Sequence, residues 1–110
     1  MSISKCSMCG LCKANCPVFL VRLTEKDSPR GKALLIKEDF LTGDFYNCTL
    51  CGACTVECPS DIDLELRSMR KKLVDQGKVT KANKEMIEKV RKYGNPFGDG
   101  SADSKDLYCC

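Results

Sequence analysis

The fold of this 110-residue chain is decided by one stretch, Cys48-Thr-Leu-Cys51-Gly-Ala-Cys54-Thr-Val-Glu-Cys58-Pro59. Its four cysteines are spaced C-x2-C-x2-C-x3-C and are followed by proline, the spacing of cysteines that bind 4Fe-4S clusters in bacterial proteins. The same pattern occurs a second time between Cys6 and Pro17, again with a glycine between the second and third cysteines. The repeat therefore predicts two 4Fe-4S clusters.

The spacing also predicts which cysteines bind which cluster. When two such motifs occur in one protein, the fourth cysteine of each run binds the cluster centred on the other run. We therefore expect a first cluster on Cys6, Cys9, Cys12 and Cys58, and a second on Cys48, Cys51, Cys54 and Cys16. This exchange would tie the two halves of the chain together.

Ten cysteines in a short chain have other interpretations, which the sequence disfavours. A secreted disulfide scaffold would need an export segment, and none precedes Cys6. Structural zinc usually takes separated C-x2-C pairs rather than three cysteines in succession. No apolar run approaches the roughly 18 residues that span a bilayer. We expect a cytoplasmic protein without direct membrane insertion, which leaves room for a peripheral position on a membrane complex.

The net charge of +3 counts every cysteine as neutral. Each 4Fe-4S cluster with four thiolates is a unit of charge about −2, so two clusters would bring the protein to about −1. The basic residues are therefore no argument for a nucleic-acid partner. The chain also has no histidine, no Gly-rich dinucleotide fingerprint and no phosphate-binding loop. We assign no residue a catalytic role.

Helical spacing dominates the rest of the chain. The prolines after both motifs predict helices there, and Ser28-Pro29 predicts the start of a helix over residues 29–42 that stops at Gly43. After the second motif, Ser60 or Asp61 is expected to cap a helix that continues to Gly77. No segment has the alternation of a strand. The fold class predicted is all-α, with two interleaved cluster-binding loops.

A final helix is expected between Thr80 and Gly94, with an apolar stripe through Met86, Ile87, Val90 and Tyr93. We interpret this stripe as core packing, with a docking face as the alternative. The basic residues of the last two helices are interpreted as solvated surface, with a docking patch for an acidic redox partner as the alternative. They are Arg67, Arg70, Lys71, Lys72, Lys78, Lys81, Lys84, Lys89, Arg91 and Lys92.

Four features together resemble a known family. They are the paired cysteine loops, Ser28-Pro29-Arg30-Gly31-Lys32, the helical segment after the second loop, and Gly94-Asn95-Pro96-Phe97-Gly98. Over residues 6–98 the chain resembles the α-helical ferredoxin module of heterodisulfide-reductase-like iron-sulfur subunits. Similar modules occur in the iron-sulfur subunits of glycolate oxidase and anaerobic glycerol-3-phosphate dehydrogenase. The resemblance implies electron transfer to or from a redox-enzyme subunit: a dehydrogenase, a hydrogenase or a cysteine-rich reductase.

The resemblance also implies a domain organisation. Residues 1–98 would form the two-cluster α-helical ferredoxin domain, and residues 99–110 a flexible tail. Because the chain ends at Cys109-Cys110, where a cysteine-rich domain would begin in longer relatives, this tail is interpreted as the start of such a domain, as unpaired thiols, or as a ligand or redox pair. Two other functions stay open: a truncated catalytic subunit of a thiol-disulfide reductase, and an iron-sulfur sensor.

Overall fold

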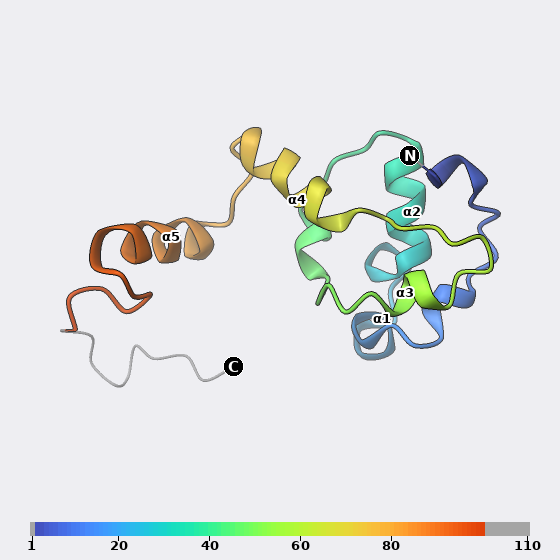
Figure 1. The fold of residues 1–110 in the computed structure, drawn as a ribbon, viewed down its shortest axis with the longest axis horizontal. Coiled ribbons are helices and arrows are strands. Elements are labelled where there is room, and N and C mark those ends of the chain that lie inside the picture. The colour runs from blue at the N-terminus through green and yellow to red at the C-terminus, as the bar shows by residue number, and fades with distance from the viewer. Residues whose placement is uncertain (1, 101–110) are drawn as a thin grey trace. The chain divides into compact units, whose positions relative to one another are not determined.

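We describe residues 2–100 of the chain in a computed structural model (Figure 1). It divides the chain into two compact units, Met1–Lys78 and Val79–Cys110. The first unit contains four short helices, α1 (Pro17–Arg22), α2 (Pro29–Lys37), α3 (Ala53–Val56) and α4 (Leu66–Asp75), and four 3-10 turns, η1 (Ser2–Lys5), η2 (Leu11–Lys13), η3 (Glu25–Asp27) and η4 (Gly43–Asn47). The second contains α5 (Lys81–Tyr93).

The predicted fold class is confirmed, since residues 2–100 contain helices and turns but no strand. Within that range no helix is long and apolar enough to cross a lipid bilayer. The prediction of one domain over residues 1–98 stays a prediction. Cys109, Cys110 and most of the predicted tail lie outside the described residues.

The beginning of α2 is the structural centre of the first unit (Figure 1). As predicted, Ser28 caps the helix: its Oγ accepts a hydrogen bond from the Gly31 N–H at 2.9 Å, and Pro29 occupies the first turn. The same hydroxyl donates to the carbonyl oxygen of Glu25 at 2.7 Å. The helix contacts η1, η2 and η3, so it positions the segments on both sides of the first cysteine motif.

The end of α2 comes earlier than predicted, at Lys37 instead of residue 42. Asp39 adopts a left-handed conformation with φ 51°, and the Phe40 N–H donates to the carbonyl of Leu35 at 2.8 Å. This is the hydrogen-bond pattern that commonly ends helices, usually with glycine at the left-handed position. Because aspartate tolerates that conformation, the helix ends without a glycine and the sequence carried no obvious stop signal.

Residues 59–65 form a turn followed by irregular backbone, and α4 begins only at Leu66, so the prediction that the second motif leads directly into a helix is wrong. Asp61 and Glu65 have φ values of 48° and 47°, a left-handed conformation that cannot continue a helix into α4. Between them, Ile62 and Leu64 are both buried at a spacing of two, which is the period of an extended segment. The apolar spacing interpreted as one helix therefore combines an irregular segment with α4. The predicted helix after Pro17 does form, as α1.

Two small apolar clusters hold the first unit together. One is built on Ala33, Ile62 and Leu64 and includes the partly buried Cys6, Cys54 and Cys58. The other is built on Phe45, Met69 and Leu73. Gly43, predicted as a helix stop, instead begins η4, the turn that carries Phe45 into the second cluster. The cysteines thus lie against one of the two cores.

The second unit contains α5 and the turn that follows it. The predicted caps are confirmed: Thr80 Oγ1 accepts from the Asn83 N–H at 3.3 Å, and Gly94 ends the helix with φ 78°. The stripe predicted as core is not buried in any part of α5, and Val90 is 44% exposed. Within the described part of this unit, a single helix and a turn provide no second layer to bury it. In the turn, Asn95 Oδ1 accepts from the Gly98 N–H at 2.9 Å.

Candidate metal centre

The two cysteine motifs have the same local backbone conformation. Met8 and Leu50, at equivalent positions before the second cysteine, have φ values of 61° and 58°. Gly10 and Gly52, immediately after it, have φ values of 85° and 77°. Glycine adopts this left-handed conformation without steric cost, which explains its recurrence in both motifs. The sequence repeat is therefore also a structural repeat.

This conformation exposes the second cysteine of each motif and places a backbone donor beside it. The thiols of Cys9 and Cys51 are exposed. Hydrogen bonds from the backbone of Leu11 and Ala53, respectively, lower the pKa of these two thiols below the usual value. A hydrogen bond to the thiolate stabilises the charged form, which is the form that binds metal.

The third cysteine of each motif is partly buried and has the opposite pKa shift. Burial raises the pKa of Cys12 to about 11, with the nearby charge of Cys54 adding to the effect. Burial also raises the pKa of Cys54, to which the charge of Cys48 contributes. Several thiolates this close repel one another, so a positively charged metal group is needed to hold them all deprotonated.

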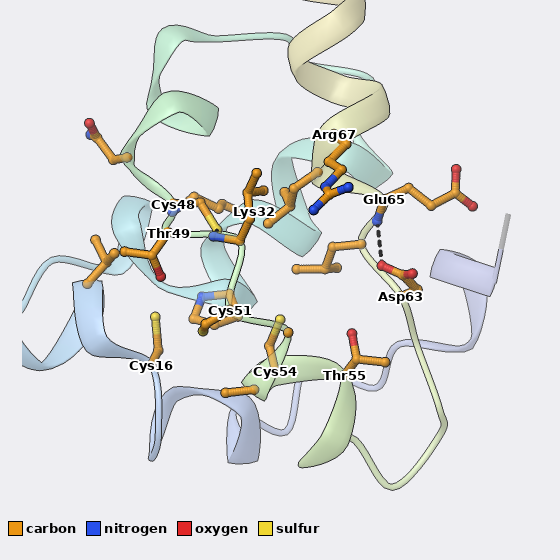
Figure 2. Close-up of a pocket in the computed structure, with 18 of the residues that line it drawn as sticks. Cys16, Lys32, Cys48, Thr49, Cys51, Cys54, Thr55, Asp63, Glu65 and Arg67 are labelled. Atoms are coloured by element: carbon orange, nitrogen blue, oxygen red, sulfur yellow. Dashed lines mark hydrogen bonds between the residues drawn. The ribbon is translucent and has the colours of Figure 1, made fainter.

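One cavity, which we call the Cys48 cavity, has a volume of about 440 Å³ and is lined by Cys16, Cys48, Cys51 and Cys54. Figure 2 shows these cysteines around the cavity. Three of them come from the second motif, and Cys16 comes from the first, where it also caps α1 and accepts from the Phe19 N–H at 3.4 Å. The cavity thus collects cysteines from both motifs.

A second cavity, which we call the Cys6 cavity, has a volume of about 40 Å³ and is lined by Cys6, Cys9, Cys12 and Cys58, with Cys54 also at its wall. Pro29 and Leu64 line both cavities, which are therefore neighbours. Cys16 lines the cavity with the cysteines of the second motif and Cys58 the cavity with those of the first, while Cys54 lines both. Their role as ligands remains a prediction.

The thiols surround these cavities and do not converge on a point. Within residues 2–100, no three Cys, Asp or Glu side chains come close enough together to hold a single metal ion. Four thiols around a cavity are instead the donor set of an iron-sulfur cluster, in which each cysteine binds a different iron. The cysteines at each cavity therefore supply the donor set of a 4Fe-4S cluster.

Beside the Cys48 cavity lies a buried polar network that the sequence did not reveal. Asp27 is fully buried, and its carboxylate accepts from Arg22 Nε at 2.7 Å, Thr24 Oγ1 at 2.6 Å and Asn47 Nδ2 at 2.9 Å. Burial would raise the pKa of this carboxyl, but these hydrogen bonds outweigh it and hold the pKa well below its usual range. Because Asn47 precedes Cys48, the network connects η3 to the second motif.

Lys32 is the second buried charge at this cavity. Its side chain lines the cavity (Figure 2), its residue is 2% exposed, and its Nζ donates to the backbone oxygen of Asp27 at 2.6 Å. Burial lowers the pKa of Lys32, an effect opposed by negative charge on Cys48 and Asp27. In the sequence, this residue had been interpreted only as part of the beginning of a helix.

Arg70 of α4 hydrogen-bonds to the backbone at the start of the second motif. Its Nε donates to the carbonyl oxygen of Phe45 at 3.0 Å, and its Nη2 donates to those of Tyr46, at 3.2 Å, and Cys48. The guanidinium therefore holds the backbone that leads into the second motif. The interpretation of this residue as solvated surface is wrong. Helical spacing places Arg70 on the polar face of α4 but does not indicate which cation of that face hydrogen-bonds to the rest of the protein.

Comparison with known proteins identifies the class. Residues 2–62, more than half of the chain, match the family model of the 4Fe-4S dicluster domain, and the chain belongs to this family. No curated protein matches the chain. Membership supports iron-sulfur electron transfer and the presence of 4Fe-4S clusters, and two clusters are consistent with a dicluster domain.

Proposed function

We propose that this chain is an electron-transfer subunit or module of a heterodisulfide-reductase-like redox complex and carries two 4Fe-4S clusters. The observation that carries the proposal is the pair of neighbouring cavities, which together are lined by all eight motif cysteines, with Cys54 at the wall of both. When bound, such clusters accept and release single electrons at potentials set by their surroundings. The proposed ligands are Cys6, Cys9, Cys12 and Cys58 for the Cys6 cavity, and Cys48, Cys51, Cys54 and Cys16 for the Cys48 cavity.

The chain's own residues support this role in two ways. The left-handed Gly10 and Gly52 direct backbone N–H groups toward the cysteines, which stabilises thiolates. Pro29 and Leu64 form a wall common to both cavities, so that two bound groups would lie close together. Short separation between redox groups is what stepwise electron transfer needs.

A redox-enzyme partner is proposed for the surface around the motifs. Several large apolar side chains are exposed on the short elements beside the cysteines, a feature typical of protein interaction sites. They are Leu11, Leu20, Val21, Leu23 and Val56. The proposal of a heterodisulfide-reductase-like complex is supported by the resemblance of the Ser28–Lys32 and Gly94–Gly98 segments, and the partner would be a dehydrogenase, hydrogenase or cysteine-rich reductase subunit.

The first prediction concerns cofactor content. Protein purified without oxygen should contain about eight iron and about eight acid-labile sulfide per chain, as two 4Fe-4S clusters require. After dithionite reduction, electron paramagnetic resonance should show a broad signal from two interacting clusters. Zinc without sulfide, or one isolated cluster, would contradict the proposal.

The second prediction concerns the exchange of the fourth cysteines. Cys16→Ser should disturb the cluster of the Cys48 cavity, so its spectrum should resemble that of Cys51→Ser. Cys58→Ser should likewise resemble Cys9→Ser, because both residues line the Cys6 cavity. The four variants, compared by iron content and electron paramagnetic resonance, are matched controls for one another. If Cys16→Ser instead resembles Cys9→Ser, each motif holds its own cluster and the exchange is wrong.

A further inference from the structure

Lys32 places a buried positive charge at one of the two cavities. In the part of the chain that the structure describes, no carboxylate forms an ion pair with its ammonium, because the Asp27 carboxylate pairs with Arg22 and Lys32 reaches only the Asp27 backbone oxygen. A buried cation without a paired anion is costly. Negative charge on Cys48, Asp27, Cys16 and Asp44 acts on this ammonium. The two carboxylates have ion-pair partners of their own, Arg22 for Asp27 and Lys26 for Asp44, so the cysteines are the groups left to compensate Lys32.

The Cys6 cavity has no equivalent charge. The one charged residue that lines it is Arg30, whose side chain is 34% exposed and whose Nε lies 2.6 Å from Glu25 Oε1 in an ion pair. The hydrogen bond from Arg30, together with that from Lys13 at 3.2 Å, lowers the pKa of Glu25 to about 2, so the carboxylate stays charged at neutral pH and is shared by these two cations. Exposure to water weakens the remaining field of the guanidinium. The positive charge at the Cys6 cavity is therefore ion-paired and partly exposed, whereas Lys32 is buried and forms no ion pair.

The other charged residues at the Cys48 cavity do not cancel Lys32. Asp63, Glu65 and Arg67 are exposed, so water screens them. The buried Asp27 carboxylate already has its own cation in Arg22. Among the charged residues that line this cavity, Lys32 is the buried one that forms no ion pair.

We propose that Lys32 is the counter-charge of the cluster in the Cys48 cavity and makes it the easier of the two clusters to reduce. The inference rests on the proposed function. Reduction adds one negative charge to a cluster, and a fixed positive charge nearby favours the reduced form and raises the potential. Because only one cavity has such a charge, two clusters with identical cysteine motifs would differ in potential, and an electron entering the pair would reside on the cluster of the Cys48 cavity.

The test is a redox titration of the parent, Lys32→Met and Lys32→Arg proteins, monitored by electron paramagnetic resonance. In Lys32→Met, which removes the charge at similar side-chain length, one of the two midpoint potentials should become more negative. The equilibrium constant for reduction of that cluster should fall about tenfold or more, which is ~59 mV for a one-electron couple. Lys32→Arg keeps the charge and should keep both potentials close to those of the parent.

Lys37→Met is the matched control. Lys37 lies on the same helix, but its ammonium is exposed and donates to the Cys6 backbone oxygen at 3.2 Å. Its removal should leave the potential that Lys32 controls unchanged. Equal shifts in Lys32→Met and Lys37→Met would mean that burial is irrelevant, and would overturn the proposal.

Each remaining outcome is also decisive. If Lys32→Met holds both clusters at parental potentials, the proposal is wrong. If Lys32→Met loses a cluster that Lys32→Arg retains, the charge itself is required and the proposal stands. If both variants lose it, Lys32 acts through packing and the proposal fails. Iron and sulfide analysis of the parent, made first, separates these results from failure of the proposed function, which would appear as a parent protein without two clusters.

Discussion

Replacing Gly31 by alanine is expected to destabilise the first unit by about 3 kcal/mol or more. A Cβ at this position would lie 1.9 Å from the backbone oxygen of Glu25, 2.8 Å from its carbonyl carbon and 3.2 Å from Lys26 Cα. All three atoms belong to the backbone of η3, so no side-chain rotation can relieve the overlap. Alanine normally stabilises a helix relative to glycine by about 1 kcal/mol, so the packing reverses the usual sign.

The measurement is urea unfolding of the parent and of two variants, Gly31→Ala and Gly43→Ala. A Cβ on Gly43 would meet no atom within 4 Å, which makes it the matched control. Its free energy of unfolding should stay within about 1 kcal/mol of the parent value. Because α2 carries Lys32 and contacts η2 and η3, Gly31→Ala should also lower the iron content. A Gly31→Ala protein as stable as Gly43→Ala would show that η3 does not pack against α2 in this way.

Cysteine spacing carried most of what could be predicted about the site. The C-x2-C-x2-C-x3-C pattern imposes a local conformation, which is why residues as different as Met8 and Leu50 share a left-handed φ. The exchange of the fourth cysteines was expected from the presence of two such patterns. The structure brings Cys16 to the wall of the Cys48 cavity, in agreement with that expectation, and leaves ligation to be measured.

Helix boundaries were predicted well only where the chain uses its commonest signals. Ser28, Thr80, Gly77 and Gly94 have the caps or stops expected of them. The errors occurred where a residue other than glycine took a left-handed conformation, as Asp39 does after α2. Such a conformation is stabilised by tertiary packing more than by the residue's own preference, so a single sequence does not reveal it.

Buried charge was the other feature that the sequence concealed. Asp27 and Lys32 are polar residues beside a helix start, where solvated side chains are common, and nothing in the periodicity distinguishes a buried one. Their burial follows from the close approach of η3 and α2 that Gly31 permits. The absence of a side chain at Gly31 thus leads to the burial of two charged residues, Asp27 and Lys32. Only the three-dimensional packing shows that these three residues are related.

Arg70→Met is expected to loosen the second motif and to reduce the retention of the cluster proposed for the Cys48 cavity. The guanidinium donates to the backbone oxygens of Phe45, Tyr46 and Cys48, and hydrogen bonds to a charged group each contribute about 1.5–3 kcal/mol. Part of that contribution will be recovered by water, so we expect a loss of about 3 kcal/mol in the free energy of unfolding. The three N–H donors of lysine sit on one nitrogen, whereas Arg70 reaches the three carbonyls from Nε and Nη2, so Arg70→Lys should rescue little of the loss.

Lys71→Met is the control for Arg70→Met, because Lys71 is the next residue of α4 and is exposed. The three variants are compared by urea unfolding and by iron and sulfide content after anaerobic purification. Arg70→Met should lose iron equivalent to one cluster, and the remaining spectrum should resemble that of Cys51→Ser, since both changes affect the Cys48 cavity. If Arg70→Met keeps a full complement of iron and the stability of Lys71→Met, the backbone before Cys48 does not depend on this guanidinium. In that case the cysteine loop must hold its conformation through the left-handed Leu50 and Gly52 alone.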